Sequence, residues 1–127
     1  MIDHITIEVS DYETSRDFYE KALAPLNYQL LMEIAEFAGF GDDDNIGPIA
    51  PFWIKRGKAP SNSIHFAFTT NSREVVRQFY DEAIKAGGKD NGLPGIRTAY
   101  HPNYYAAFIL DPDGYNVEVV CHEPEDN

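Results

Sequence analysis

The sequence has a single cysteine and few basic residues, and both shortages narrow what the protein can do. Cys121 has no partner for an internal disulfide, which fits the reducing conditions of the cytoplasm. Ten Lys and Arg residues against 21 Asp and Glu leave a formal net charge of −11. Such a surface repels phosphate backbones and anionic lipids, so neither nucleic acid nor a membrane is an expected partner. No apolar run approaches the roughly 20 residues of a membrane helix, and no basic-then-apolar segment opens the chain, so no export signal is expected.

The remaining composition favours one globular domain. The chain has 127 residues, of which 43% are hydrophobic, and its eight Phe and eight Tyr residues are enough for a core. The sequence contains no Gly-rich phosphate loop, no zinc-type cysteine cluster and no Ser-His-Asp order. The sequence therefore gives no motif support for nucleotide binding, structural zinc binding or serine-type acyl transfer.

An internal repeat is the most informative pattern. When His4 is aligned with His65, the residues HITI fall on HFAF, and further along the residues RDFYE fall on RQFYD. A repeat of this kind indicates a duplicated structural module. Each copy begins with a histidine on a predicted strand, so two imidazoles occupy equivalent positions.

The predicted elements follow the same order in both copies. Apolar alternation predicts a strand at each start, a helix follows, and three more strands complete a β-α-β-β-β unit. We expect module one at residues 1–58, module two at residues 63–122, and a loose acidic tail at residues 123–127.

Three local patterns add detail. Ser10 followed by Glu13 has the form of a capping box and predicts the start of the first helix. Residues 89–103 are rich in Gly, Pro and Asn, which predicts a loop with one short strand near residues 97–100. The Asp-Pro-Asp-Gly of residues 111–114 predicts a turn that joins the last two strands.

The alternation of side chains predicts where three chemically active groups point. On the first, fifth and last predicted strands, the more apolar set of side chains is expected to face the helix of its module. His4, His65 and Glu118 belong to the opposite set and share the other face of the sheets. Two imidazoles and a carboxylate can bind a divalent metal and leave open positions for a substrate. The alternative for an isolated strand histidine is an ordinary hydrogen bond.

The same segments resemble the vicinal oxygen chelate superfamily, the group of glyoxalase I, extradiol dioxygenases and bleomycin-resistance proteins. The matching parts are residues 4–7 followed by residues 18–19, residues 65–68, and residues 105–118. The resemblance covers nearly the whole chain, and the last segment is its most specific part. It implies an α+β fold in which two tandem βαβββ modules form a cupped mixed sheet.

The resemblance also implies a metal site. Metal-binding members take their ligands from the first strand of each module and from the final strand, where this chain has His4, His65 and Glu118. The metal is expected to be Fe²⁺, Mn²⁺, Ni²⁺ or Zn²⁺, and members of this length often form homodimers with sites shared between subunits. Glyoxalase I has a fourth ligand on the last strand of its first module. Trp53 stands there in this chain, and an indole cannot bind a metal.

The expected function is Lewis-acid chemistry on a small molecule with two neighbouring oxygen atoms, of lyase or isomerase type. A ring-cleaving dioxygenase of the extradiol type is the alternative, because the predicted ligands resemble its 2-His-1-carboxylate triad. A metal-free protein that binds a small molecule or confers resistance is the alternative from another class.

Four further residues are candidates for the site. His101 is a candidate general acid or base, because histidine titrates near neutrality, or else a surface histidine in a loop. Tyr105 either donates a hydrogen bond to a metal-held oxygen or simply packs. Arg97 either attracts a substrate carboxylate or pairs with one of the many acidic side chains. Trp53 forms either an aromatic wall for a ligand or part of the core.

Overall fold

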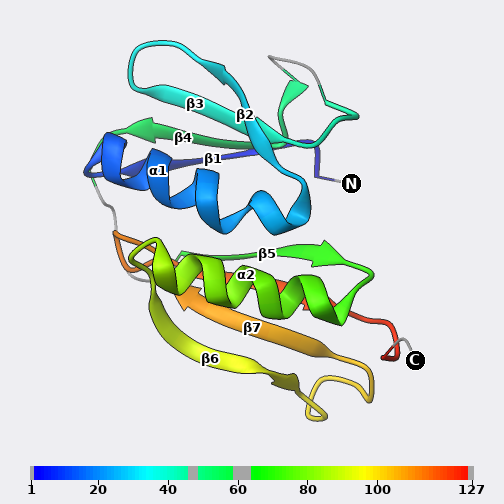
Figure 1. The fold of residues 1–127 in the computed structure, drawn as a ribbon. Coiled ribbons are helices and arrows are strands. Elements are labelled where there is room, and N and C mark those ends of the chain that lie inside the picture. The colour runs from blue at the N-terminus through cyan, green and yellow to red at the C-terminus, as the bar shows by residue number, and fades with distance from the viewer. Residues whose placement is uncertain (1, 46–48, 59–63, 126–127) are drawn as a thin grey trace.

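Two four-stranded sheets, each with its own helix, make up the structure (Figure 1). It is a computed structural model that describes residues 2–45, 49–58 and 64–125. The first unit contains β1 (Ile5–Val9), α1 (Tyr12–Ala22), the short 3₁₀ helix η1 (Ala24–Leu26), β2 (Gln29–Glu33), β3 (Phe37–Gly41) and β4 (Phe52–Arg56). The second contains β5 (His65–Thr70), α2 (Arg73–Lys85), β6 (Lys89–Ile96), β7 (Tyr105–Leu110) and β8 (Asn116–Cys121). The predicted α+β fold of two βαβββ modules is therefore confirmed.

The two sheets have the same topology. The strand orders are β1-β4-β3-β2 and β5-β8-β7-β6. The pairs β1–β4 and β5–β8 are parallel, and the other pairs are antiparallel. The first strand of each module is consequently an edge strand. Over the described ranges the two sheets share no ladder of hydrogen bonds, so β1 and β5 each keep one side of their backbone unpaired.

The core lies between the sheets and the two helices, which lie side by side on one side of the molecule (Figure 1). Val9, Ile54, Val117 and Val119 are fully buried on the helix-facing side of their strands, as the alternation predicts. The helices themselves contact each other and so join the two halves. No helix in the described part of the chain is both long and apolar enough to cross a membrane.

The start of α1 differs from the predicted capping box. Asp11 is the N-cap, and its side chain accepts a hydrogen bond from the backbone N–H of Thr14 at 3.2 Å. The prediction that Ser10 caps this helix is therefore wrong. The backbone N–H and hydroxyl of Ser10 instead donate to the carboxylate of Asp113 in the second module. The carboxylate of Asp113 is a stronger acceptor than a neutral group, which accounts for this different partner.

The turn between β7 and β8 fastens the two modules together. Asp111 is 4% exposed, and its carboxylate accepts a hydrogen bond from the buried hydroxyl of Tyr19 on α1. The hydroxyl of Tyr115 donates to the backbone carbonyl of Glu8 at the end of β1, at 2.5 Å. Residues 111–115 thus make side-chain hydrogen bonds to the first module in addition to forming the predicted turn.

The strand β6 was not predicted in this place. Residues 89–96 form a strand despite two glycines and a proline, whereas the short strand expected near residues 97–100 is absent there. The reason is its position at the edge of the sheet, where proline and glycine are tolerated. Two register shifts against β7 accommodate the irregular residues.

Candidate active site

A histidine and a buried carboxylate form a pair on the open face of the second sheet. His65 begins β5, and Glu118 lies on the neighbouring strand β8. The Nε2 atom of His65 lies 3.2 Å from Oε1 of Glu118. Val117 and Val119, on either side of Glu118, pack into the core under α2. The pair therefore lies on the face turned away from the helix, and its glutamate is only 2% exposed.

The hydrogen bonds of His65 leave one ring nitrogen available to a metal. Its Nδ1 atom lies 3.0 Å from the backbone carbonyl of Asn116, and because a carbonyl only accepts, Nδ1 carries the proton. In the neutral ring, Nε2 then presents its lone pair beside Glu118. Two donors that bind one ion at about 2.0–2.2 Å are separated by about 2.8–3.6 Å for bond angles between 90° and tetrahedral. The spacing of 3.2 Å and the chemistry of the two donors therefore fit a transition-metal ion.

Tyr104 holds the other oxygen of Glu118. Its hydroxyl donates a hydrogen bond to Oε2 of that carboxylate. Burial, followed by the hydrogen bond to Glu118, raises the pKa of Tyr104 to about 12, so the phenol keeps its proton at neutral pH. Sequence reasoning missed this residue, because the exact start of β7 decides which of two adjacent tyrosines faces the site.

Tyr105 points to the opposite face, where it packs, which corresponds to the second of the two alternatives expected for it. Its ring lies 5.1 Å and 5.7 Å from the guanidinium groups of Arg73 and Arg77, which both belong to α2. Arg77 also donates a hydrogen bond to its hydroxyl at 3.2 Å. Successive side chains of a strand alternate between faces, so Tyr105 packs under the helix while Tyr104 reaches Glu118.

His101 forms a pair with His122 that no sequence pattern indicates. The Nε2 atom of His101 lies 2.7 Å from Nδ1 of His122, and the two rings stack with 5.0 Å between their centres. The backbone N–H of Asn103 donates to Nδ1 of His101 at 3.1 Å. The proton of a neutral His101 is therefore on Nε2 and is donated to His122. Both rings meet the edge of Tyr104, at 5.4 Å and 5.3 Å, which connects them to Glu118 through one side chain.

Arg97 reaches the same face of the second sheet. Its guanidinium lies 5.4 Å from the centre of the Phe108 ring. Phe108 faces Glu118 in the register of β7 and β8, and its ring centre is 6.3 Å from that of His65. Phe108 thus separates a cationic side chain from the histidine–carboxylate pair.

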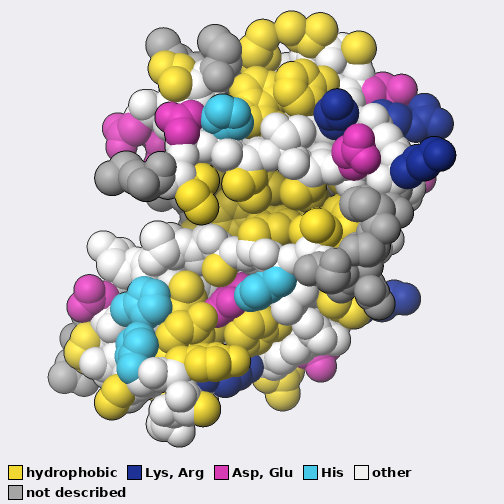
Figure 2. Space-filling view, turned by 180° about the vertical axis from the view of Figure 1, so that it is seen from behind, with side chains coloured by type: hydrophobic (Ala, Val, Ile, Leu, Met, Phe, Trp, Pro, Cys, Tyr) yellow, Lys and Arg dark blue, Asp and Glu magenta, His cyan; other side chains and the backbone are white. Residues whose placement is uncertain are grey.

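His4 lies in the first module, across a cleft from His65. It directly precedes β1, and its Nδ1 atom is 2.7 Å from the carboxylate of Asp3. Both histidines line a largely apolar cleft of about 580 Å³ between the edge strands β1 and β5, which Figure 2 shows as a hollow between the two halves. Among the described residues, no three His, Cys, Asp or Glu side chains gather closely enough to hold an ion. Within one chain, the three predicted ligands are therefore divided between the two modules, with His4 in the first and His65 and Glu118 in the second.

Trp53 lies on the open face of the first sheet, beside His4. Its ring stacks on Phe37 with 4.8 Å between the centres, and its indole N–H donates to the carbonyl of Ala50 at 2.7 Å. Gly39 leaves room for the ring, since a Cβ atom there would come within 2.8 Å of it. These side chains border an apolar pocket of about 310 Å³ that is lined by His4, Thr6, Met32, Ile34, Phe37 and Trp53. Trp53 is 7% exposed and so serves both as part of the packing and as a wall of this pocket.

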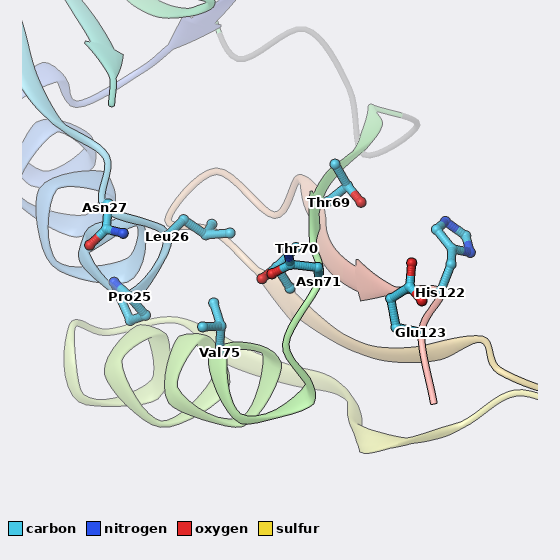
Figure 3. Close-up of a pocket in the computed structure, with 9 residues that line it drawn as sticks. All are labelled: Pro25, Leu26, Asn27, Thr69, Thr70, Asn71, Val75, His122 and Glu123. Atoms are coloured by element: carbon cyan, nitrogen blue, oxygen red, sulfur yellow. The ribbon is translucent and has the colours of Figure 1, made fainter. Parts of the chain in front are cut away.

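Another hollow lies where η1 meets the end of β5 and the chain after β8 (Figure 3). It has a volume of about 530 Å³ and is lined by Pro25, Leu26, Asn27, Thr69, Thr70, Asn71, Val75, His122 and Glu123. In Figure 3 the side chains of Leu26 and Val75 project into this space, whereas the His122 ring points away from them. Its lining includes His122 and Glu123, but these two described side chains make no contact like that of His65 with Glu118, so we assign the candidate site to the faces of the sheets.

Fold and site together define a class of protein: two βαβββ modules with metal-binding side-chain types on open sheet faces beside a shared cleft. The profile of the Glyoxalase/Bleomycin resistance protein/Dioxygenase superfamily matches residues 1–119. The chain belongs to this superfamily. No functionally curated protein matches the chain.

Solved structures agree with this assignment. A glyoxalase/bleomycin resistance protein from Albidiferax ferrireducens T118 superposes with a TM-score of 0.77 at 23% identity, covering 96% of this chain and 97% of that one. A glyoxalase-related enzyme from Fulvimarina pelagi gives 0.71 at 16% identity, covering 95% and 87%. The V278E mutant of glyoxalase I from Zea mays gives 0.69 at 26% identity, covering 94% of this chain but 45% of the maize chain. At 23% and 16% identity, the first two similarities show a shared fold and nothing more.

Proposed function

We propose that this protein is a homodimeric, metal-dependent enzyme of lyase or isomerase type that acts on a small molecule with two neighbouring oxygen atoms. The observation that carries the proposal is the pair formed by His65 and the buried Glu118. Its spacing of 3.2 Å and the tautomer imposed by Asn116 both suit metal binding. The likeness to a maize glyoxalase I mutant supports the reaction class.

A third ligand from a second subunit completes the proposed site. His4 stands on the opposite wall of the cleft, and β1 and β5 both have an unpaired edge there. A two-fold dimer that brings β1 of one subunit beside β5 of the other would bury these apolar walls and set the partner's His4 against His65 and Glu118. Trp53 supplies no fourth ligand, so the remaining metal positions stay open to substrate and water.

The bound metal, Fe²⁺, Mn²⁺, Ni²⁺ or Zn²⁺, would act as a Lewis acid toward the two substrate oxygens. The protein's own groups have separate tasks. Tyr104 keeps its proton and fixes the orientation of Glu118. His101 and His122 take up and pass on a proton, because the Nε2 proton of one is already shared with the other. The apolar surface around Trp53 excludes water from the first-module side of the substrate.

A mixing experiment tests the shared site. His4→Ala and His65→Ala should each abolish metal binding when purified alone. In mixed dimers one site loses both histidines and the other keeps both, so refolding the two variants together should restore about a quarter of the sites. Metal content and turnover of a hemithioacetal measure the recovery. A mixture that forms dimers but recovers no metal would show that the site is not shared. Wild-type protein with less than about a tenth of an equivalent of metal after incubation with Ni²⁺ or Fe²⁺ would favour a metal-free binding protein.

A ring-cleaving dioxygenase is the second candidate. The observation in its favour is Trp53, whose indole restricts the proposed protein ligands to two histidines and one carboxylate, the set that non-haem Fe²⁺ oxygenases use. Oxygen uptake with catechols by the Fe²⁺-loaded protein, in the absence of hemithioacetal turnover, would favour this candidate.

A further inference from the structure

Arg97 differs from the other arginines in having no carboxylate within 4 Å among the residues that the structure describes. Arg16, Arg56, Arg73 and Arg77 each lie within 4 Å of a carboxylate. Arg97 makes no such contact with any residue that the structure describes. In a protein with 21 acidic residues and a net charge of −11, an arginine without an ion pair on the candidate active-site face is unusual.

The guanidinium of Arg97 is nevertheless held in a defined position. One of its nitrogens, Nη2, donates a hydrogen bond to the carbonyl of Leu93 at 2.7 Å. Its central carbon lies over the ring of Phe108, 5.4 Å from the ring centre. Two glycines make room for it: a Cβ atom on Gly92 would lie 3.2 Å from Nη2, and one on Gly95 would lie 3.1 Å from Nη1. A guanidinium has five N–H donors. Among the described groups, the side chain of Arg97 donates a hydrogen bond only to the backbone carbonyl of Leu93.

Arg97 is also at a useful distance from the proposed metal ligands. Phe108 lies between them, 5.4 Å from the guanidinium and 6.3 Å from the ring of His65. The guanidinium and the imidazole are therefore at most about 12 Å apart, which is within the span of a small organic molecule. A planar guanidinium with free donors matches a carboxylate, which it can bind with two parallel hydrogen bonds.

We infer that Arg97 binds a carboxylate of the substrate, so that the substrate is a small organic acid carrying this group a few bonds from its two neighbouring oxygens. This inference rests on the proposed function, because it assumes that the oxygen pair lies at His65 and Glu118. Arg97 also offsets the repulsion that the acidic surface exerts on an anionic substrate. Replacing Arg97 should therefore lower the affinity for the substrate and leave metal binding unchanged.

Two probes that differ in one carboxylate test the inference. Catechol and 3,4-dihydroxybenzoate have the same pair of oxygens, and 4-nitrocatechol controls for the acidity that a ring substituent confers. Their affinity for the Zn²⁺-loaded dimer can be measured by the fluorescence of Trp53 and by calorimetry, with no turnover required. We expect 3,4-dihydroxybenzoate to bind about tenfold or more tightly than either probe without a carboxylate. Arg97→Met should remove this preference and leave catechol affinity and Zn²⁺ content unchanged.

Arg56→Met is the matched control, since it removes an exposed arginine of β4 that is paired with Glu36. It should leave all affinities as they are in the wild type. Equal binding of the three probes to the wild type, or a carboxylate preference that survives in Arg97→Met, would overturn the inference about Arg97. Failure of the wild type to bind Zn²⁺, or of every probe to bind the Zn²⁺-loaded protein, would instead overturn the proposed function.

Discussion

Replacing Tyr104 with phenylalanine isolates the hydrogen bond that orients Glu118. The change removes one oxygen and keeps the ring that packs on His101 and His122. Glu118 is 2% exposed, and His65 and Tyr104 are its two side-chain partners among the described residues. A hydrogen bond to a charged group contributes about 1.5–3 kcal/mol, which corresponds to about 10- to 100-fold in a binding constant. Outer partners of metal ligands have effects of the same size, so we expect Zn²⁺ affinity to fall by about 10- to 100-fold.

Tyr105→Phe is the control for this prediction, because it removes the same atom one residue further along, on the opposite face. Titration calorimetry with Zn²⁺ on chelator-treated protein measures both variants, and circular dichroism checks their folding. We expect wild-type affinity in Tyr105→Phe, which instead loses a hydrogen bond to Arg77 on α2. A Tyr104→Phe affinity within twofold of the wild type, or an equal loss in Tyr105→Phe, would refute the reasoning.

Three further changes test other parts of the structure. Burial raises the pKa of Asp111, so this group contributes stability that is present below its ordinary pKa and is lost as the pH rises through the raised value. Asp111→Asn should therefore lose more unfolding free energy at acidic pH than at pH 7 in urea titrations; an equal loss at both would contradict this. Gly39→Ala places a Cβ within 2.8 Å of the Trp53 ring and should cost about 1–3 kcal/mol of stability, with a shift in tryptophan emission that an unperturbed ring would not show. His122→Ala removes the partner of His101 and should lower kcat by about 100-fold at nearly constant KM; an unchanged kcat would exclude the pair from proton transfer.

Much of the fold could be predicted because it follows from repetition and alternation. The recurrence of His4 as His65 revealed the two modules, and period-two patterning predicted that Val117 and Val119 face a helix. The edge strand β6 escaped prediction because its glycines and proline resemble a loop, and only its place at the edge of the sheet makes them acceptable. The N-cap was off by one residue because Ser10 has a distant partner, Asp113, that local patterns do not contain.

The site was less predictable than the fold, for physical reasons. Tyr104 and Tyr105 are adjacent, and a shift of one residue in the start of β7 exchanges their faces. The contact of His101 with His122 depends on the path of a loop, which no periodicity records. The separation of His4 from His65 depends on how two similar modules pack, and a repeat carries no information about whether its copies complete a site within one chain or between two.

The turn of residues 111–115 lies within the most specific part of the superfamily resemblance, yet the side chains of Asp111 and Tyr115 form hydrogen bonds to the neighbouring half of the molecule. A related chain that keeps only this turn would keep the hydrogen bonds between its halves even if it had none of the three predicted ligands. The presence of this turn in a sequence therefore indicates how the two modules are connected. Whether a relative can bind a metal depends instead on the amino acids that it carries at the places of His4, His65 and Glu118.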